Sequence, residues 1–265
     1  MTNWILIFLA VNIVIYSVIL SNFLSRSFLN FLNIGQGNSV LIFNRRNVFL
    51  YDTGPSGFRL LKELRNNLPP FQKTIDVLFL SHPDKDHYGG TEELISRYKV
   101  RIVLIPFIES KESGWLQLLQ KLQQNRIKII KLRIGDIVKT KDFQIAILNP
   151  PTNFKLNDND ASLVLKIQRK HSYLLTGDIE QRGVKNLINC CRDLIKSEII
   201  LVPHHGSKYS LNFLFWQLVN PSLAIIQVGK NNYGHPHREV LETFHNLNIH
   251  FKRTDLDGEI KFIEF

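Results

Sequence analysis

The stretch FLSHPDKDHYGG, Phe79 to Gly90, decides how this chain folds and where its chemistry lies. His82, Asp84, Asp86 and His87 bring two imidazoles and two carboxylates into six consecutive positions. An apolar run precedes them and two glycines follow, which lets the backbone bend closely at this point. Imidazoles and carboxylates that alternate at the end of a buried strand are typical ligands of a divalent metal ion.

Composition indicates an ordinary folded protein with a basic surface. The chain has 265 residues, 44% of them hydrophobic and 21% charged, which excludes a disordered chain. Its 33 Lys and Arg against 23 Asp and Glu give a net charge of +10, which favours nucleic acid or anionic lipid as a partner. A solubilising surface explains the same charge equally well. The basic segment 121–141 is open to the same two interpretations.

The two cysteines, Cys190 and Cys191, are adjacent in the sequence. Neighbouring cysteines are poorly placed for an ordinary structural disulfide. We therefore expect no stabilising disulfide, and the redox compartment stays open.

The N-terminus differs from the rest of the chain. Residues 4–20, WILIFLAVNIVIYSVIL, carry no charge and one polar interruption, Asn12. This length lies at the short end of the ~17–25 residues that a membrane-spanning helix needs. A signal peptide fits less well, because no Lys or Arg precedes the run and no small-residue cleavage site follows. A buried helix is the remaining alternative. We expect residues 1–28 to be a single-pass anchor in the cell membrane and residues 29–265 to be one domain.

Strands and helices alternate from residue 29 onward without any internal repeat. Strands outnumber helices and the connections are short, which favours an α/β sandwich of two packed sheets with helices outside them. Strands are predicted in 31–43, 47–54, 75–82, 100–107, 127–133, 143–149, 162–167, 172–178, 198–206, 224–229, 250–254 and 259–265, and helices in 58–68, 91–98, 112–125, 179–195 and 237–247.

Further polar motifs follow other apolar runs. They are TGD, which ends at Asp178; PHHGS, with His204, His205 and Ser207; and NNYGHPH, with His235. Several such motifs at strand ends predict that imidazoles and carboxylates converge at one sheet edge, as a metal site requires.

These motifs resemble a known family. The patterns HxDxDH, YDTG, LLTGD and PHHGS are similar to those of the metallo-β-lactamase fold. The finer set, NIGQGNSVLI, SHPDKDHYGG, NDASLVLKI, YLLTGDIE, VPHHGSKYS, NNYGHP and RTDLDGEIKF, occurs in the order of the C-terminal domain of the ComEC DNA-internalisation competence family. The resemblance covers nearly all of residues 29–265. It implies a four-layer αββα sandwich with a two-metal site, and hydrolysis of DNA, degrading the strand that is not imported.

The chain departs from that family in three ways. It has room for one span only, so a separate channel subunit is implied for DNA uptake. Asn33 and Asn38 stand where the family usually has aspartate. The usual third-motif histidine is missing, and His171 is poorly placed to replace it; the segment NDAS is expected to take its place. Four residues from these motifs and His235 are expected beside the metals or the substrate: Asn159, Asp160, Ser162, Ser207 and His235.

The resemblance also implies how two ions would be held. Two metals about 3.5–4 Å apart hold a hydroxide and neutralise an attacked phosphate. His82 and Asp84 would bind one ion and Asp86 and His87 the other, with Asp178 bridging them; His204 or His205 would complete the site. Asp86 and Asp178 are the predicted catalytic residues.

Metal identity is expected to follow from the ligand types. Asp84 replaces a histidine of the wider superfamily, and an oxygen ligand shifts preference from zinc towards manganese or magnesium. The remaining histidines still favour zinc. We expect two divalent ions, Mn²⁺ or Zn²⁺, with Mg²⁺ as the third candidate.

The leading hypothesis is a membrane-anchored, metal-dependent phosphodiesterase that acts on DNA, with single-stranded DNA as the expected substrate. The alternatives are a hydrolase of another small substrate and an inactive nucleic-acid-binding subunit. Arg26, Arg45 and Arg46 follow the apolar run, so the positive-inside rule places the domain in the cytoplasm. The resemblance implies the outer face, and we expect an extracytoplasmic domain.

Overall fold

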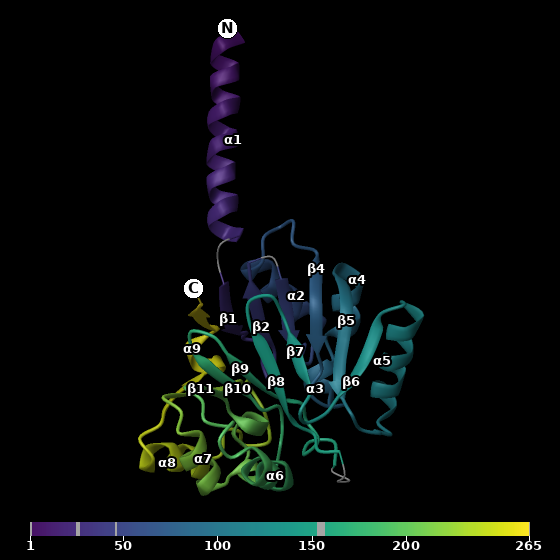
Figure 1. Cartoon of the computed structure of the whole chain (residues 1–265), viewed down its shortest axis with the longest axis vertical. Coiled ribbons are helices and arrows are strands. Elements are labelled where there is room, and N and C mark those ends of the chain that lie inside the picture. The colour runs from purple at the N-terminus through teal and green to yellow at the C-terminus, as the bar shows by residue number, and fades with distance from the viewer. Residues whose placement is uncertain (1, 25–26, 46, 153–156, 265) are drawn as a thin grey trace.

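Two seven-stranded sheets lie face to face in the computed structural model (Figure 1), which describes residues 2–24, 27–45, 47–152 and 157–264. The first sheet has the order β14-β1-β2-β3-β4-β5-β6 and the second the order β13-β12-β11-β10-β9-β8-β7. The strands of the first sheet are β1 Ser27–Phe31, β2 Val40–Asn44, β3 Asn47–Tyr51, β4 Thr74–Phe79, β5 Lys99–Pro106, β6 Lys128–Leu132 and β14 Ile260–Ile263. Those of the second are β7 Ile137–Lys139, β8 Gln144–Asn149, β9 Val164–Gln168, β10 Ser172–Leu175, β11 Ile199–Leu201, β12 Leu223–Ile226 and β13 His250–Arg253.

Helices cover the outer face of each sheet. The helices of the described residues are α1 Thr2–Leu24, α2 Gly57–Asn67, α3 Lys85–Tyr88, α4 Thr91–Arg97, α5 Ser113–Gln124, α6 Gln181–Cys191, α7 Phe213–Val219, α8 Arg238–Asn246 and α9 Thr254–Asp257, with short 3₁₀ turns η1 Pro203–Gly206 and η2 Lys208–Ser210. Of these, α2, α4 and α5 pack on the first sheet, and α6, α7 and α8 on the second.

Alternating apolar side chains explain the four layers. In β2, Val40 and Ile42 face the core between the sheets, whereas Leu41 and Phe43 face the helices outside. Every residue of β2 is buried, as expected for a strand covered on both faces. The predicted αββα sandwich is confirmed.

The direction of the strands brings the polar motifs together. β3, β4, β5 and β6 are parallel, as are β10, β11, β12 and β13. The two sets end close to each other, because the Leu163 N–H donates to the Ser81 carbonyl and the Ser39 N–H to the Gln227 side chain. One edge of the sandwich therefore collects the residues that follow these strands.

Some predicted elements differ from the structure. The stretch 31–43 is the end of β1, a loop and β2, and β1 begins at Ser27, two residues before the expected domain boundary. β7 was not predicted because it is a short edge strand with exposed side chains. α7 was not predicted because its sequence, FLFWQLV, is almost wholly apolar and lacks a polar face. The predicted strand 198–206 ends at Leu201 and continues into the η1 turn.

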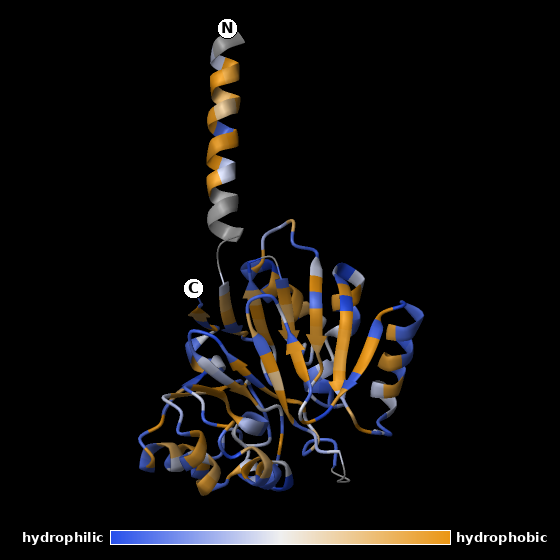
Figure 2. Cartoon of the chain, in the orientation of Figure 1, coloured by the Kyte–Doolittle hydropathy of each residue, from blue (hydrophilic) through white to orange (hydrophobic). Residues whose placement is uncertain are grey.

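The N-terminal helix α1 extends away from the sandwich (Figure 1), and most of its residues between 4 and 18 are hydrophobic (Figure 2). Large side chains from Trp4 to Val18 are exposed. Even so, across the described residues no helix combines the length and apolar character that crossing a bilayer requires. The span predicted over residues 4–20 is not supported. Arg26 and Arg46, on which the charge rule relied, lie outside the described residues.

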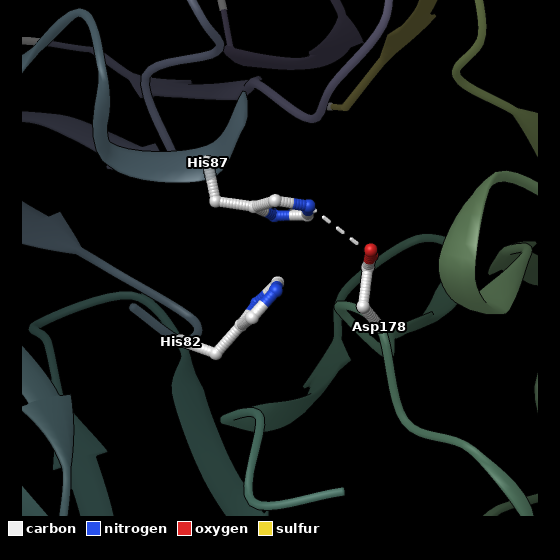
Figure 3. Close-up of side chains that lie close together, drawn as sticks. All are labelled: His82, His87 and Asp178. Atoms are coloured by element: carbon white, nitrogen blue, oxygen red, sulfur yellow. Dashed lines mark ion pairs between the residues drawn. The ribbon is translucent and has the colours of Figure 1, made fainter. Parts of the chain in front are cut away.

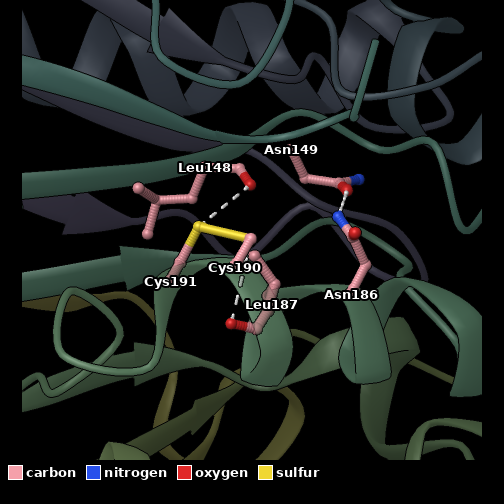
Figure 4. Close-up of a disulfide and its surroundings, with 6 residues drawn as sticks. All are labelled: Leu148, Asn149, Asn186, Leu187, Cys190 and Cys191. Carbon is pink, nitrogen blue, oxygen red and sulfur yellow. Dashed lines mark hydrogen bonds between the residues drawn. A yellow bond between two sulfur atoms is a disulfide. The ribbon is translucent and has the colours of Figure 1, made fainter. Parts of the chain in front are cut away.

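Cys190 and Cys191 are joined by a disulfide at the end of α6 (Figure 4), although their adjacency argued against an ordinary structural bridge. The bond links consecutive residues, so it closes no loop of the unfolded chain and contributes little of the entropy that makes longer bridges stabilising. The contacts around it are local: Cys191 Sγ lies 3.9 Å from the Leu148 carbonyl oxygen, and Asn186 donates to Asn149 nearby.

Candidate metal centre

Three loops from both sheets supply the predicted ligands. His82 follows β4, and Asp86 and His87 lie in α3 directly after it. Asp178 follows β10, and His204 and His205 form the η1 turn after β11. The structure therefore brings together motifs that lie more than a hundred residues apart in the chain.

The first group of ligands contains His82, His87 and Asp178, whose side chains point toward one another (Figure 3). The ring centroids of His82 and His87 are 4.1 Å apart, and His87 Nε2 lies 3.2 Å from Asp178 Oδ1. All three residues are buried. Their nitrogen and oxygen atoms are close enough to share one cation.

The second group contains Asp86, His87 and His205. His205 Nε2 lies 3.2 Å from Asp86 Oδ2 and 3.5 Å from Asp178 Oδ2. Asp178 thus directs one carboxylate oxygen toward His87 and the other toward His205. This is the position that a bridging carboxylate would occupy.

Asp84 and His204 lie at the margin of these groups. Asp84 Oδ2 is 3.5 Å from His82 Nε2, but its side chain is 45% exposed and belongs to neither group. His204 Nε2 is 3.7 Å from Asp178 Oδ2, while its Nδ1 is 3.2 Å from Glu180 Oε1. Of the two adjacent histidines, His205 is therefore the better placed ligand. Both have left-handed backbones, with φ of 47° and 54°, a strained conformation that clusters at functional sites.

The donor set fits a divalent cation. Buried atoms that form no hydrogen bond include Nε2 of His82, Nε2 of His87 and Oδ1 of Asp178. Leaving such an atom unpaired costs about 1–3 kcal/mol. Lone pairs of nitrogen and oxygen that converge in a buried space are what a metal ion satisfies. Both side-chain polar atoms of the buried Asn38 are also unpaired, and its backbone N–H donates to the Asp86 carbonyl.

Opposite charges dominate the electrostatics of the site. Burial opposes ionisation of Asp178, but His87, His205 and His204 outweigh it and hold the pKa of this carboxyl well below its usual range. Burial likewise opposes the charge on His87, but the carboxylates of Asp178, Asp52 and Asp86 raise its pKa well above the ordinary value. A cation that binds here displaces protons from these rings, so binding is expected to weaken as pH falls.

Asp52, in the motif YDTG after β3, is a further candidate functional residue, which the sequence patterns did not single out. Its Oδ2 lies 2.8 Å from His87 Nδ1, and its two oxygens accept hydrogen bonds from the Ser81 N–H and hydroxyl, each at 2.7 Å. The Ser81 hydroxyl oxygen also lies 2.9 Å from His82 Nδ1. These contacts hold both rings by Nδ1 and leave Nε2 free for a ligand, as carboxylate–histidine pairs do in metal proteins. The sequence signal that could have identified Asp52 was an aspartate directly after a buried strand.

Close backbone contact between two loops makes the Asp52 contact feasible. A Cβ on Gly89 would lie 2.8 Å from the Pro55 carbonyl oxygen, and one on Gly90 would lie 2.5 Å from that of Thr53. The two glycines therefore serve close approach, which lets the loop after β3 reach the turn that carries His87.

The segment 159–162 supports the site without joining either ligand group. The Ser162 hydroxyl accepts a hydrogen bond from the Asp178 N–H at 3.1 Å. Asp160 Oδ1 accepts from the N–H groups of Glu180 and Gly183, which holds the start of α6. Asn159 Nδ2 donates to Glu180 Oε1 at 3.3 Å. These residues position Asp178 and the carboxylate beside His204.

Ser207 and His235 have different positions. The Ser207 hydroxyl accepts a hydrogen bond from the Tyr209 N–H at the start of η2, a capping role. The His235 ring lies 5.3 Å from that of His204. Burial and the neighbouring His204, His205 and His237 lower the pKa of His235 to about 4. His235 is therefore a neutral imidazole beside the ligand groups at neutral pH.

Residues 32–229 match the Metallo-beta-lactamase superfamily. The chain is 33% identical over 250 residues to ComE operon protein 3 of Bacillus subtilis, covering 87% of this chain and 32% of that protein. It is 29% identical over 235 residues to Recombination protein 2 of Haemophilus influenzae, covering 87% and 28%, and 27% identical over 230 residues to competence protein ComA of Neisseria gonorrhoeae, covering 86% and 31%. The chain thus spans about a third of these relatives.

Solved structures share the fold. The metallo-beta-lactamase fold protein YhfI from Bacillus subtilis superposes with a TM-score of 0.62 at 13% identity, covering 90% of this chain and 99% of that one. Tm1679, a metal-dependent hydrolase of the beta-lactamase superfamily, gives 0.58 at 14% identity, covering 89% and 98%. These likenesses show the arrangement of the two sheets.

Proposed function

The chain belongs to the metallo-beta-lactamase superfamily, and we propose that within it the protein is a metal-dependent phosphodiesterase that cleaves DNA, with single strands as the preferred substrate. The observation that carries the proposal is the pair of candidate ligand groups, which share His87 and each approach one carboxylate oxygen of Asp178. A chain without a metal would have to bury these unpaired nitrogen and oxygen atoms at a cost.

The residues of the site have separate tasks in such a reaction. When bound, two divalent ions, Mn²⁺ or Zn²⁺, with Mg²⁺ as the third candidate, supply a hydroxide at neutral pH and offset the charge of the phosphate. His82 with Asp178, and Asp86 with His205, would hold them, with His87 within reach of both. His235 accepts a hydrogen bond or a proton at neutral pH and adds no charge beside an anionic substrate, because its pKa is about 4.

Two observations support a nucleic acid as the substrate. One relative is named competence protein ComA, another Recombination protein 2 and the third ComE operon protein 3. In addition, Phe107 follows β5 at the edge of the sandwich that carries the ligands, and its ring is 51% exposed. Lys131 Nζ and Arg133 Cζ lie 5.9 Å and 5.7 Å from the centre of that ring. An exposed aromatic ring beside two cations suits a base and its neighbouring phosphates, and such stacking contributes about 1–3 kcal/mol per base.

The expected cell location and partners extend this proposal. We propose that α1, whose apolar side chains are exposed, attaches the chain to the cell membrane with its domain outside the cytoplasm, beside a separate channel subunit of a DNA-uptake system. Fractionation of cells that produce the chain with and without residues 1–26 tests the attachment. Recovery of the intact chain in the soluble fraction would contradict it.

The activity is tested with the purified chain, labelled single- and double-stranded oligonucleotides, and Mn²⁺, Zn²⁺ or Mg²⁺, with EDTA as the metal control. Asp178→Ala serves as the matched inactive variant. We expect metal-dependent cleavage that EDTA and the variant abolish, faster on single strands. Hydrolysis of bis(p-nitrophenyl) phosphate without cleavage of DNA would point to a small phosphodiester instead, and equal DNA cleavage by the variant would refute the site.

A further inference from the structure

A basic groove lies on the side of the first sheet opposite to the metal centre. Its volume is about 740 Å³, and it lies between α2, α4 and the connection from α2 to β4. Four cations and two aromatic rings line it: Lys62, Arg65, Lys73, Arg97, Phe58 and Tyr98. Further lining residues are apolar.

The four cations of this groove are free to bind an anion. All four are exposed, and within the described parts of the chain none of them forms an ion pair. Lys73 Nζ lies 5.6 Å from the centre of the Tyr98 ring. The acids of α4 are engaged elsewhere, since Glu92 pairs with Lys121 and Glu93 packs beside Gly57. Glu63 of α2 interacts with Lys62 and offsets part of its charge, which leaves the groove with a net positive charge.

The topology places this groove at the end of the domain where α1 joins it. Lys73 directly precedes β4 and Tyr98 directly precedes β5, so the groove lies at the N-terminal edge of these parallel strands. β1 runs in the same direction, because it is antiparallel to β2 and β2 is antiparallel to β3. β1 begins at Ser27, three residues after the last residue of α1, a reach of about 10 Å at most.

Apolar side chains accompany the charge at this end. Phe71, in the connection between α2 and β4, is 52% exposed. Figure 1 shows this connection at the end of the sandwich from which α1 extends. The metal ligands follow the opposite, C-terminal ends of the same strands, about 20 Å away for a strand of six residues.

We infer that this basic groove docks the domain on a membrane surface that contains anionic phospholipids. Their phosphates would bind the four cations, and Phe71 would enter the interfacial layer. The docked domain holds its metal centre on the far side, open to a substrate in solution. This inference goes beyond the proposed reaction and stands whether or not the chain cleaves DNA.

A nucleic acid is the other polyanion that a basic groove attracts, but the surroundings favour a membrane. The groove's cations lie at the end of the first sheet opposite to the candidate metal ligands. A DNA strand bound in the groove would therefore need a long path to reach the metal centre. Exposed apolar side chains of α1 and Phe71 lie at the same end, and these suit lipid better than a phosphate backbone.

The test measures co-flotation of the full chain with vesicles of phosphatidylcholine alone and of an equimolar mixture with phosphatidylglycerol. The apolar helix α1 contributes to binding of both kinds of vesicle. The ratio of the affinity for the mixed vesicles to the affinity for phosphatidylcholine vesicles therefore measures the contribution of the cations. One Lys or Arg near an anionic surface is worth about a fivefold change in affinity, so Lys73→Gln/Arg97→Gln is expected to lower the ratio roughly 25-fold. The matched control, Lys185→Gln/Arg192→Gln, changes two exposed cations on the α6 side of the second sheet and is expected to keep the wild-type ratio.

Two outcomes would overturn the inference. One is an equal ratio for the wild type and the Lys73→Gln/Arg97→Gln variant, with both shown to be folded by circular dichroism. The other is a variant that keeps the vesicle ratio but loses affinity for a single-stranded oligonucleotide, which would assign the groove to nucleic acid. A higher salt concentration should lower the wild-type ratio, because screening weakens exposed charges.

Discussion

Replacement of Asp52 by Asn tests how the site holds His87. The carboxylate accepts three hydrogen bonds, from the Ser81 N–H at Oδ1 and from the Ser81 hydroxyl and His87 Nδ1 at Oδ2. Asn has the same shape and tolerates the left-handed φ of 59° at this position. In one orientation of the Asn side chain, its NH₂ group faces the Ser81 N–H. In the other orientation, the NH₂ group faces Nδ1 of His87. One contact is therefore lost in either case, and a donor faces a donor.

The expected consequence is weaker metal binding. Loss of a carboxylate that orients a ligating histidine typically lowers metal affinity by about 10–100-fold, equivalent to about 1.4–2.7 kcal/mol. The affinity is measured by competition with a chromophoric chelator, using Mn²⁺ and Zn²⁺ in turn. A second measure is the rise in melting temperature on addition of metal, which depends on the dissociation constant and requires no activity.

Asp76→Asn is the matched control. Asp76 is another partly buried carboxylate, which accepts from the Val48 N–H at 2.9 Å and pairs with Arg101 at the opposite end of the first sheet. This variant is expected to bind metal as the wild type does. If Asp52→Asn and Asp76→Asn both retained the wild-type affinity, the role of Asp52 in orienting His87 would be refuted.

Three further changes have defined outcomes. Asp178→Ala and Asp86→Ala are each expected to lower phosphodiester hydrolysis by more than about 100-fold, because a ligand should matter more than the residue that orients one; retained turnover with a normal metal content would remove that residue from the site. Asp84→His is expected to shift preference toward zinc, measured by metal analysis after exposure to equal Zn²⁺ and Mn²⁺, and identical occupancy would refute a ligand role. Burial, partly offset by Glu198, lowers the pKa of Lys166 from 10.5 to about 8. The unfolded chain then binds more protons between these values, so the free energy of unfolding should rise with pH there, more steeply than in Lys166→Met; parallel pH profiles of urea denaturation would contradict this.

The sequence by itself was sufficient for the ligand types and for the layers of the fold. The alternation of His82, Asp84, Asp86 and His87 after an apolar run predicted a metal site, because those side chains lie on one short turn at a strand end. Burial of a strand on both faces is visible as an unbroken apolar run, and strand ends that share an edge bring their loops together. The αββα sandwich followed from these local patterns and from the resemblance.

Only the tertiary structure decided which ligands meet. Asp86 and His205 are separated by 119 positions, yet Oδ2 and Nε2 lie 3.2 Å apart because the second sheet packs across the first. The same packing placed Asp178 between the two groups, favoured His205 over His204 and set Asp52 against His87. It also placed Asp84 at the exposed margin. These distances depend on the register of two sheets and the shapes of many buried side chains, so no local stretch of sequence contains them.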